Sequence, residues 1–205
     1  QQATKVGKMY NKPIDLLCSS NLVRAIGTAS YIGKNIQLND ESNRKVFVLP
    51  NISEVGTYVN HGARSLLETN DYFNQEENTL PLSFDYKYIN DKLSQQPCNY
   101  ETFMETTAKQ LVNDLHKQYP NKKEFTIMVV SHGGFLGRNL PRQKFRKSVS
   151  SHKINNTAIW KLEYDFNIKD NNLTQIKKWA ENLYDGGKLA NYSEYNQQFD
   201  YCNFD

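Results

Sequence analysis

The sequence has few of the features that mark secreted, metal-binding or membrane proteins. It contains three cysteines, Cys18, Cys98 and Cys202, and an odd number at such wide spacing predicts neither a disulfide framework nor a paired-cysteine metal site. No stretch approaches the roughly 20 apolar residues of a membrane span, and no signal peptide is visible. We therefore expect no membrane partner and a reducing, intracellular (cytoplasmic) compartment.

The sequence also lacks a large excess of one charge. Among its 205 residues, 25 Lys and Arg stand against 22 Asp and Glu, which gives a net charge of +3. This mild surplus does not demand nucleic acid and would suit a basic pocket for a small anion equally well. The mean hydropathy of −0.74 is low for a globular protein, and it predicts very polar surfaces and loops around one core.

Short apolar runs alternate with helical patterns along the chain. Residues 14–19, 45–49 and 125–130 read as strands, and the last run, FTIMVV, is so apolar that we expect both of its faces to be buried. Such alternation indicates an α/β fold with a mostly parallel sheet. The helical patterns fall at residues 1–10, 22–32, 100–119 and directly after the last strand.

We interpret residues 1–205 as a single domain with two peripheral parts. Residues 70–99 are polar and rich in Asn and Gln, and we expect a long insertion or lid outside the core. Residues 158–165 alternate like a half-buried strand, and 173–179 suggest an antiparallel edge strand. The Tyr- and Asn-rich tail, about 183–205, is predicted to be peripheral.

Three side chains suited to phosphoryl chemistry each follow a predicted strand: Arg24, Glu54 and His132. Because the carboxyl ends of parallel strands meet at one edge of a sheet, these residues can meet there. A guanidinium matches phosphate oxygens, an imidazole can stabilise phosphoryl charge, and a carboxylic acid can protonate a leaving oxygen. Taken singly, an Arg at a helix start or a Glu in a loop is more often solvated or salt-bridged.

Several segments carry a family resemblance. Residues 20–29, SNLVRAIGTA, resemble an S-x-L-x-R-A-x-x-T-A motif, and residues 129–134, VVSHGG, resemble the second histidine motif of the same family, the histidine phosphatase superfamily of phosphoglycerate mutase-like proteins. Residues 2–7 are similar to its Q-A-x-x-x-G helix, 52–54 to its L-x-E segment and 155–165 to its last core strand. The likeness spans nearly the whole chain apart from the insertion and the tail.

The resemblance implies a three-layer sandwich, with the central sheet flanked by helices, and a role for each candidate residue. Arg24 would bind the phosphoryl group, and His132 would bind it and stabilise the transition state. Glu54 would donate a proton to the leaving group, and backbone NH groups at Gly133 would assist. The resemblance implies no metal or organic cofactor, and its partner would be a phosphorylated small molecule or a phosphopeptide.

One element of the family's pattern is missing. The family's nucleophilic histidine lies in an R-H-G motif on a central strand beside the strand that carries His132, and no histidine precedes Ser20 here. Without that strand, backbone groups would remain unpaired in the middle of the sheet. We therefore expect a separate N-terminal segment to supply the nucleophile, whether cleaved, carried on another chain or upstream of Gln1.

The other histidines are weaker candidates. His61 precedes a glycine but lacks the preceding arginine, so we interpret it as a surface residue rather than a substitute nucleophile. His116, near a helix end, and His152, in a basic loop, are interpreted as structural or exposed.

Three functions are compatible with the sequence. The first is a phosphomonoester hydrolase, favoured over a mutase because no mutase-specific stretch is visible. The second is a catalytically inactive protein of the same fold with a binding or structural role. The third, nucleic-acid binding through residues 138–153, has no supporting motif or interleaved aromatics. The basic residues of that segment would reach a polyanionic substrate or form a solvated face: Arg138, Arg142, Lys144, Arg146 and Lys147.

Overall fold

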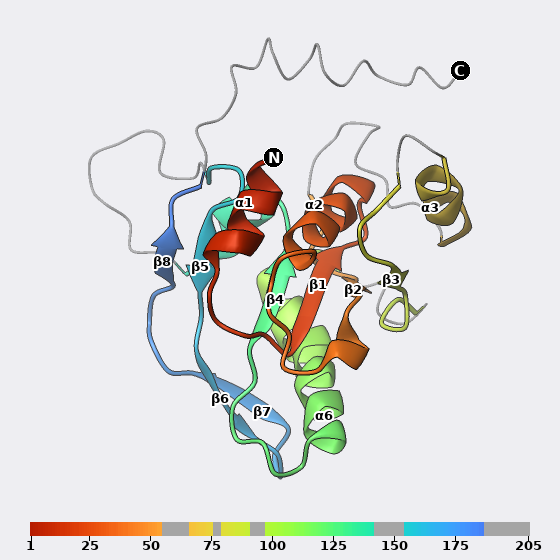
Figure 1. Cartoon of the computed structure of the whole chain (residues 1–205). Coiled ribbons are helices and arrows are strands. Elements are labelled where there is room, and N and C mark those ends of the chain that lie inside the picture. The colour runs from red at the N-terminus through yellow and green to blue at the C-terminus, as the bar shows by residue number, and fades with distance from the viewer. Residues whose placement is uncertain (55–65, 76–78, 91–96, 142–153, 187–205) are drawn as a thin grey trace, which may run out of the picture.

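A computed structural model describes residues 1–54, 66–75, 79–90, 97–141 and 154–186 (Figure 1). Four parallel strands form the central sheet in the order β3–β2–β1–β4. The three predicted strands are confirmed to within two residues at either end, as is the mostly parallel α/β architecture. The strands of the sheet are β1 (Leu16–Ser20), β2 (Val46–Leu49), β3 (Phe84–Asp85) and β4 (Ile127–Val130).

Two apolar clusters lie on opposite faces of the sheet, because successive strand residues point to opposite sides. Leu16 and Cys18 of β1 pack with Leu111 and Leu115 on one face, whereas Leu17 packs on the other face with residues of the N-terminal helices. The result is three layers, helix–sheet–helix. The helices are α1 (Gln2–Met9), α2 (Val23–Gly33), α3 (Leu66–Phe73), α5 (Tyr100–Thr102), a π-helical continuation (Phe103–Ala108), α6 (Lys109–Gln118) and α7 (Gly133–Asn139).

Strand β4 lies at one edge of this sheet. Ile127 and Val129 pack against one apolar cluster, and Met128 and Val130 pack against the other, so both faces of β4 are covered. All four residues are nevertheless only half-buried, whereas every residue of β1 and β2 is buried. The prediction that both faces of this strand are buried therefore holds for the packing of its two faces, but the four residues are less buried than predicted. Its exposure arises at the edge, since among the described residues β4 pairs with β1 alone.

Two small antiparallel sheets complete the described structure. The expectation of one strand over residues 158–165 is wrong. The strand is interrupted at Glu163, and the segments before and after this residue pair with different strands outside the central sheet. The Glu163 carboxylate pairs with Lys161 and Lys177, and its carbonyl accepts a hydrogen bond from the NH of Ile176. The strand pairs are β5 (Ile159–Lys161) with β8 (Glu181–Tyr184), and β6 (Tyr164–Asn167) with β7 (Asn172–Gln175).

Residues 70–99 contribute more to the core than a lid would. β3 extends the sheet beyond β2, and Tyr88 is 1% exposed, with its ring edge-on to Phe47 at 6.0 Å between centroids. The expectation that this segment lies outside the core is therefore wrong for its described part. The predicted tail begins within β8, and its remainder from residue 187 lies outside the described residues.

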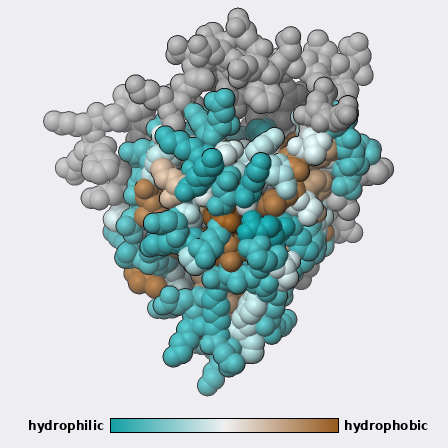
Figure 2. All heavy atoms as spheres, in the orientation of Figure 1, coloured by the Kyte–Doolittle hydropathy of each residue, from teal (hydrophilic) through white to brown (hydrophobic). Residues whose placement is uncertain are grey.

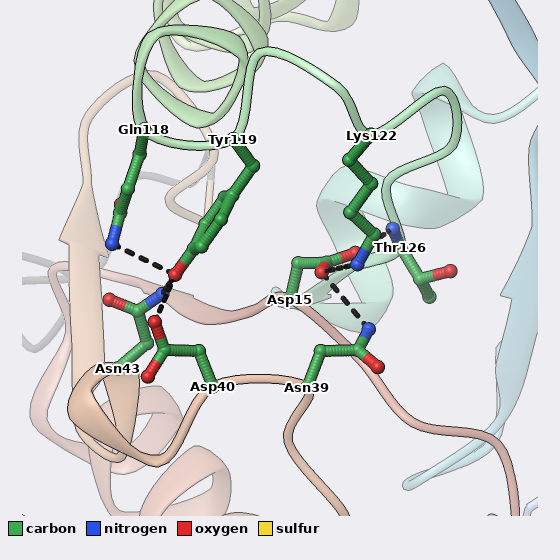
Figure 3. Close-up of polar contacts among 8 residues, drawn as sticks. All are labelled: Asp15, Asn39, Asp40, Asn43, Gln118, Tyr119, Lys122 and Thr126. Atoms are coloured by element: carbon green, nitrogen blue, oxygen red, sulfur yellow. Dashed lines mark hydrogen bonds and ion pairs between the residues drawn. The ribbon is translucent and has the colours of Figure 1, made fainter.

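A polar network joins the amino ends of β1 and β4, opposite the end at which the candidate site residues lie (Figure 3). Asp15 is 3% exposed and accepts hydrogen bonds from the NH of Thr126, at 2.7 Å, and from Nδ2 of Asn39, at 3.0 Å. Its carboxylate also pairs with Lys122. The buried charge of Asp15 is thus compensated by three donors, as a buried carboxylate requires.

The surface facing the viewer in Figure 2 is mostly hydrophilic, with small separate groups of hydrophobic residues. This matches the low mean hydropathy of the sequence. Within the described ranges, no helix combines the length and apolarity needed to cross a membrane.

Candidate functional site

The carboxyl ends of β1, β2 and β4 bring the three predicted side chains together. Arg24 is the second residue of α2, Glu54 follows the buried turn after β2, and His132 is the N-cap residue of α7. Glu54 Oε2 lies 3.6 Å from Arg24 Nη2 and 3.7 Å from His132 Nδ1. Residues 30 to 108 positions apart thus form one cluster, as the position of each after a strand predicts.

The three side chains of the cluster differ in their exposure to solvent. The His132 side chain is 4% exposed, Glu54 21% and Arg24 45%. The imidazole therefore lies deepest, and the guanidinium borders solvent. The carboxylate occupies a position between two groups that bind anions, so the same position would suit phosphoryl oxygens.

Gly134, rather than Gly133, makes the close approach to the acidic side chain. A β-carbon on Gly134 would lie 2.0 Å from Glu54 Oε1, whereas one on Gly133 would meet its nearest neighbour, the carbonyl oxygen of Ile154, at 3.4 Å. Both glycines are exposed at the start of α7. Gly133 was predicted to assist through its NH group. Gly134 was not predicted, because its role depends on a carboxylate 80 positions away in sequence.

Hydroxyl groups join the loops that carry the site. Ser53 Oγ hydrogen-bonds Asn21 Oδ1, which links the loop after β2 to the loop after β1. Ser131 Oγ donates to the carbonyl of Ile52 at 2.7 Å, which links the loop after β4 to the loop after β2. These contacts restrain the relative positions of the three loops, and no local sequence signal predicts them.

Ser20 contacts His132 and does not cap the helix that follows it. The predicted helix at 22–32 matches α2, which begins at Val23, and its N-cap residue, Leu22, makes no side-chain cap. Instead Ser20 Oγ lies 2.6 Å from His132 Nε2. Ser20 was not predicted as a site residue, although its place in the S-x-L-x-R-A segment, at a strand end, is a signal that could have identified it.

The remaining candidates lie elsewhere or outside the described residues. His116 is in the last turn of α6. It is close in sequence to Tyr119, which hydrogen-bonds Asp40 at the amino end of the sheet. Arg138 is exposed in the last turn of α7. His61, His152 and the basic positions 142, 144, 146 and 147 fall in ranges that the structure does not describe.

Metal-binding and redox features are not prominent in the described ranges. No group of three His, Cys, Asp or Glu side chains there could hold a metal ion. Cys18 and Cys98 are free thiols, and burial raises the pKa of the Cys18 thiol far above its ordinary value. Cys18 is therefore a core residue rather than a reactive nucleophile.

The comparisons with known proteins agree with this geometry. A family model described as the histidine phosphatase superfamily, branch 1, matches residues 1–181. No curated protein matched the chain. The matched region includes Arg24, Glu54, His132 and the whole parallel sheet, which is consistent with a phosphoglycerate mutase-like fold. The chain therefore belongs to the histidine phosphatase superfamily.

Proposed function

We propose that the protein is a phosphomonoester hydrolase of the histidine phosphatase type. The observation that carries this proposal is the position of the Glu54 carboxylate, 3.6 Å from the Arg24 guanidinium and 3.7 Å from the His132 imidazole. Two anion-binding groups and a proton donor are what phosphoryl transfer requires besides a nucleophile. Membership of the superfamily supports a phosphatase-like function.

Hydrolysis of the phosphomonoester would proceed in two steps. Arg24 and His132 would hold the phosphoryl oxygens while a nucleophilic histidine forms a nitrogen–phosphorus bond and the ester oxygen–phosphorus bond breaks. Glu54 would give its proton to the leaving oxygen. A water molecule, deprotonated by Glu54, would then attack phosphorus, releasing phosphate and the free histidine.

The present contacts of Glu54 are compatible with this exchange. Distances of 3.6 and 3.7 Å are longer than hydrogen bonds. An arriving phosphoryl group would therefore displace the carboxylate from Arg24 and His132 without breaking a directed hydrogen bond. The displaced carboxyl group would remain beside the phosphoryl group, where the leaving oxygen lies.

We further propose that the nucleophilic histidine belongs to a segment outside these 205 residues, which pairs with the edge of β4 that has no partner strand in the described part of the chain. The half-buried residues of β4, packed on both faces yet exposed at one edge, support this proposal. A strand added there would cover that edge, and if parallel to β4 it would end beside His132. Intact-mass analysis of the natural protein tests this: a folded monomer with the mass of these 205 residues alone would contradict it.

The substrate would be a phosphorylated small molecule or a phosphopeptide. A substrate panel that includes phosphorylated small molecules and phosphopeptides would distinguish the two. We also expect a reducing intracellular compartment.

Hydrolysis of p-nitrophenyl phosphate by the natural protein tests the function. We expect activity that falls by about 10²-fold or more in His132→Ala, because an electrostatic donor is lost. His116→Ala is the matched control, since this histidine lies in α6 away from the cluster, and it should retain activity. Binding of phosphate without hydrolysis of any phosphomonoester would instead favour a catalytically inactive member of the family.

A further inference from the structure

The buried hydroxyl of Ser20 contacts one ring nitrogen of His132. Ser20, the last residue of β1, is 0% exposed, and its Oγ lies 2.6 Å from His132 Nε2. The other ring nitrogen, Nδ1, faces Glu54 at 3.7 Å. The two nitrogens therefore have separate neighbours, one within the fold and one in the candidate phosphoryl site.

We propose that Ser20 is a positioning residue that keeps a proton on His132 Nδ1, directed at the phosphoryl site. A neutral imidazole has one donor and one acceptor nitrogen, and the partner of one nitrogen decides where the proton lies. When the Ser20 hydroxyl donates to Nε2, the proton must be on Nδ1. The catalytic use of this proton rests on the proposed function, but the tautomer does not.

A hydroxyl suits this position in both charge states of the imidazole. It donates to Nε2 of the neutral ring, and it can rotate to accept from Nε2–H of the imidazolium. Nδ1 carries a proton in each case. A carboxylate at position 20 would only accept, and it would place the proton of the neutral ring on Nε2 instead.

Ser20, His132 and Glu54 also resemble a serine nucleophile with its base and acid. The order of burial argues against that function. In such a triad the serine is open to substrate and the acid is buried, whereas here Ser20 is 0% exposed and the Glu54 side chain is 21% exposed. The NH of Leu22 approaches the same hydroxyl at 3.5 Å. Substrate therefore has access to the Glu54 side of the imidazole and not to Ser20.

The tautomer can be read directly from imidazole ¹⁵N chemical shifts in the full chain, above the pH at which the ring titrates. We expect wild-type His132 to show a protonated Nδ1 and an unprotonated Nε2. Ser20→Ala should convert it to a mixture in which the Nε2–H form is populated, and Ser20→Thr, which restores a hydroxyl, should recover the wild-type pattern. A wild-type tautomer in Ser20→Ala would overturn the proposal.

Ser19→Ala is the matched control, because Ser19 is equally buried on the same strand and its Oγ donates to the carbonyl of Ser20. It should leave the His132 shifts unchanged. Thermal unfolding monitored by circular dichroism identifies any variant that fails to fold. If Ser20→Ala does not fold, the wild-type and Ser19→Ala spectra still decide, since a dominant Nε2–H form in either would contradict the proposal.

A kinetic measurement connects the tautomer to the proposed function. Ser20→Ala should lower kcat for p-nitrophenyl phosphate by about tenfold, as expected when the partner that orients a functional histidine is removed, with KM changed much less. If no variant hydrolyses phosphomonoesters, the proposed hydrolase activity fails while the ¹⁵N result for Ser20 stands. Phosphoserine at position 20 after reaction would show a nucleophile and would overturn the positioning role.

Discussion

Glu54 lies between the guanidinium of Arg24 and the imidazole of His132, and its proposed task is to protonate the leaving oxygen. That task depends on the substrate. An alkoxide leaving group needs a proton, whereas p-nitrophenolate is stable enough to leave without one. The requirement for the carboxyl group should therefore vary with the leaving group.

We predict that Glu54→Gln lowers kcat/KM for alkyl phosphates by about 10²–10³-fold, the usual contribution of a general acid, and affects p-nitrophenyl phosphate far less. Steady-state kinetics with both substrates measure the difference. Glu124→Gln, at an exposed position before β4, serves as the control. Equal losses on the two substrates would argue that Glu54 binds phosphate and does not act as an acid.

Gly134 offers a second test of the same carboxylate. The β-carbon of Gly134→Ala would lie 2.0 Å from Glu54 Oε1, at the far end of a flexible side chain, so the carboxylate must move while the backbone need not. We predict a free energy of unfolding within about 0.5 kcal/mol of wild type, but activity on alkyl phosphates reduced toward that of Glu54→Gln.

The neighbouring substitution Gly133→Ala is the matched control for Gly134→Ala. Its β-carbon would be no closer than 3.4 Å to any other group, and its NH is retained. Thermal unfolding and alkyl phosphate hydrolysis should both be near wild type. Full activity in Gly134→Ala would show that the position of Glu54 is unimportant.

At this scale, a position a few residues after an apolar run was sufficient to predict which side chains meet. Arg24, Glu54 and His132 were all predicted in this way, and they meet. Ser20 and Gly134 were not assigned their roles, because each depends on one contact with a residue about 80 to 112 positions away. Such contacts exist only after the sheet has formed.

At the scale of elements, the close packing of α1 on α2 depends on one small residue. A β-carbon on Gly7 would lie 2.2 Å from the carbonyl oxygen of Ile32, which is backbone and cannot rotate away. Val6 and Ile32 lie in the same buried cluster. The first helix must therefore shift if position 7 gains a side chain.

We predict that Gly7→Ala destabilises the fold by about 1–3 kcal/mol, as overpacking does. Gly27→Ala in α2 is the matched control, since its β-carbon would meet only Leu80 Cδ2, at 3.9 Å. Alanine should stabilise that helix position by about 0.5–1 kcal/mol. Urea unfolding midpoints compare the two, and an unchanged midpoint for Gly7→Ala would contradict the packing argument.

The amino end of the sheet should impart a pH dependence to stability. The Tyr119 hydroxyl hydrogen-bonds Asp40 and accepts from Gln118 at 2.8 Å (Figure 3). This bond, with further hydrogen bonds from Ser42, lowers the pKa of Asp40 below its ordinary value. A lowered pKa means that the folded state binds the proton less readily than the unfolded state.

The stability that Asp40 contributes should therefore be complete above its unfolded pKa, about 3.9, and should be lost as the pH falls through the lower folded value. We predict that wild type and Asp40→Asn differ in stability at pH 6 and converge in strong acid, because the carboxyl group is then protonated. Tyr119→Phe should weaken the pH dependence. Urea unfolding over a pH series measures this, and parallel curves for wild type and Asp40→Asn would contradict it.

The elements themselves were only partly predictable. β1, β2 and β4 are apolar runs, and the helix at 100–118 has a clear apolar stripe, so local pattern was sufficient. Strand β3 and the break at Glu163 were missed, because a two-residue strand has no period and pairing partners are set by distant residues.

At the scale of the whole molecule, the proposed additional strand would account both for the edge of β4, which has no partner strand among the described residues, and for the cluster at its carboxyl end. A further strand along β4 would cover the half-buried residues of that strand. The same strand would deliver a nucleophile beside His132. We therefore expect one segment both to pair with the edge of β4 and to supply the nucleophile of the active site.

Locating the phosphoryl group on the enzyme tests this account most directly. The natural protein would be reacted briefly with a labelled phosphomonoester, quenched in alkali, which preserves phosphohistidine, and digested for mass spectrometry. We predict phosphohistidine in a peptide that is not among these 205 residues, with labelling strongly reduced in Arg24→Ala. Phosphohistidine at His61, or hydrolysis of phosphomonoesters with no phosphoenzyme at all, would contradict the account.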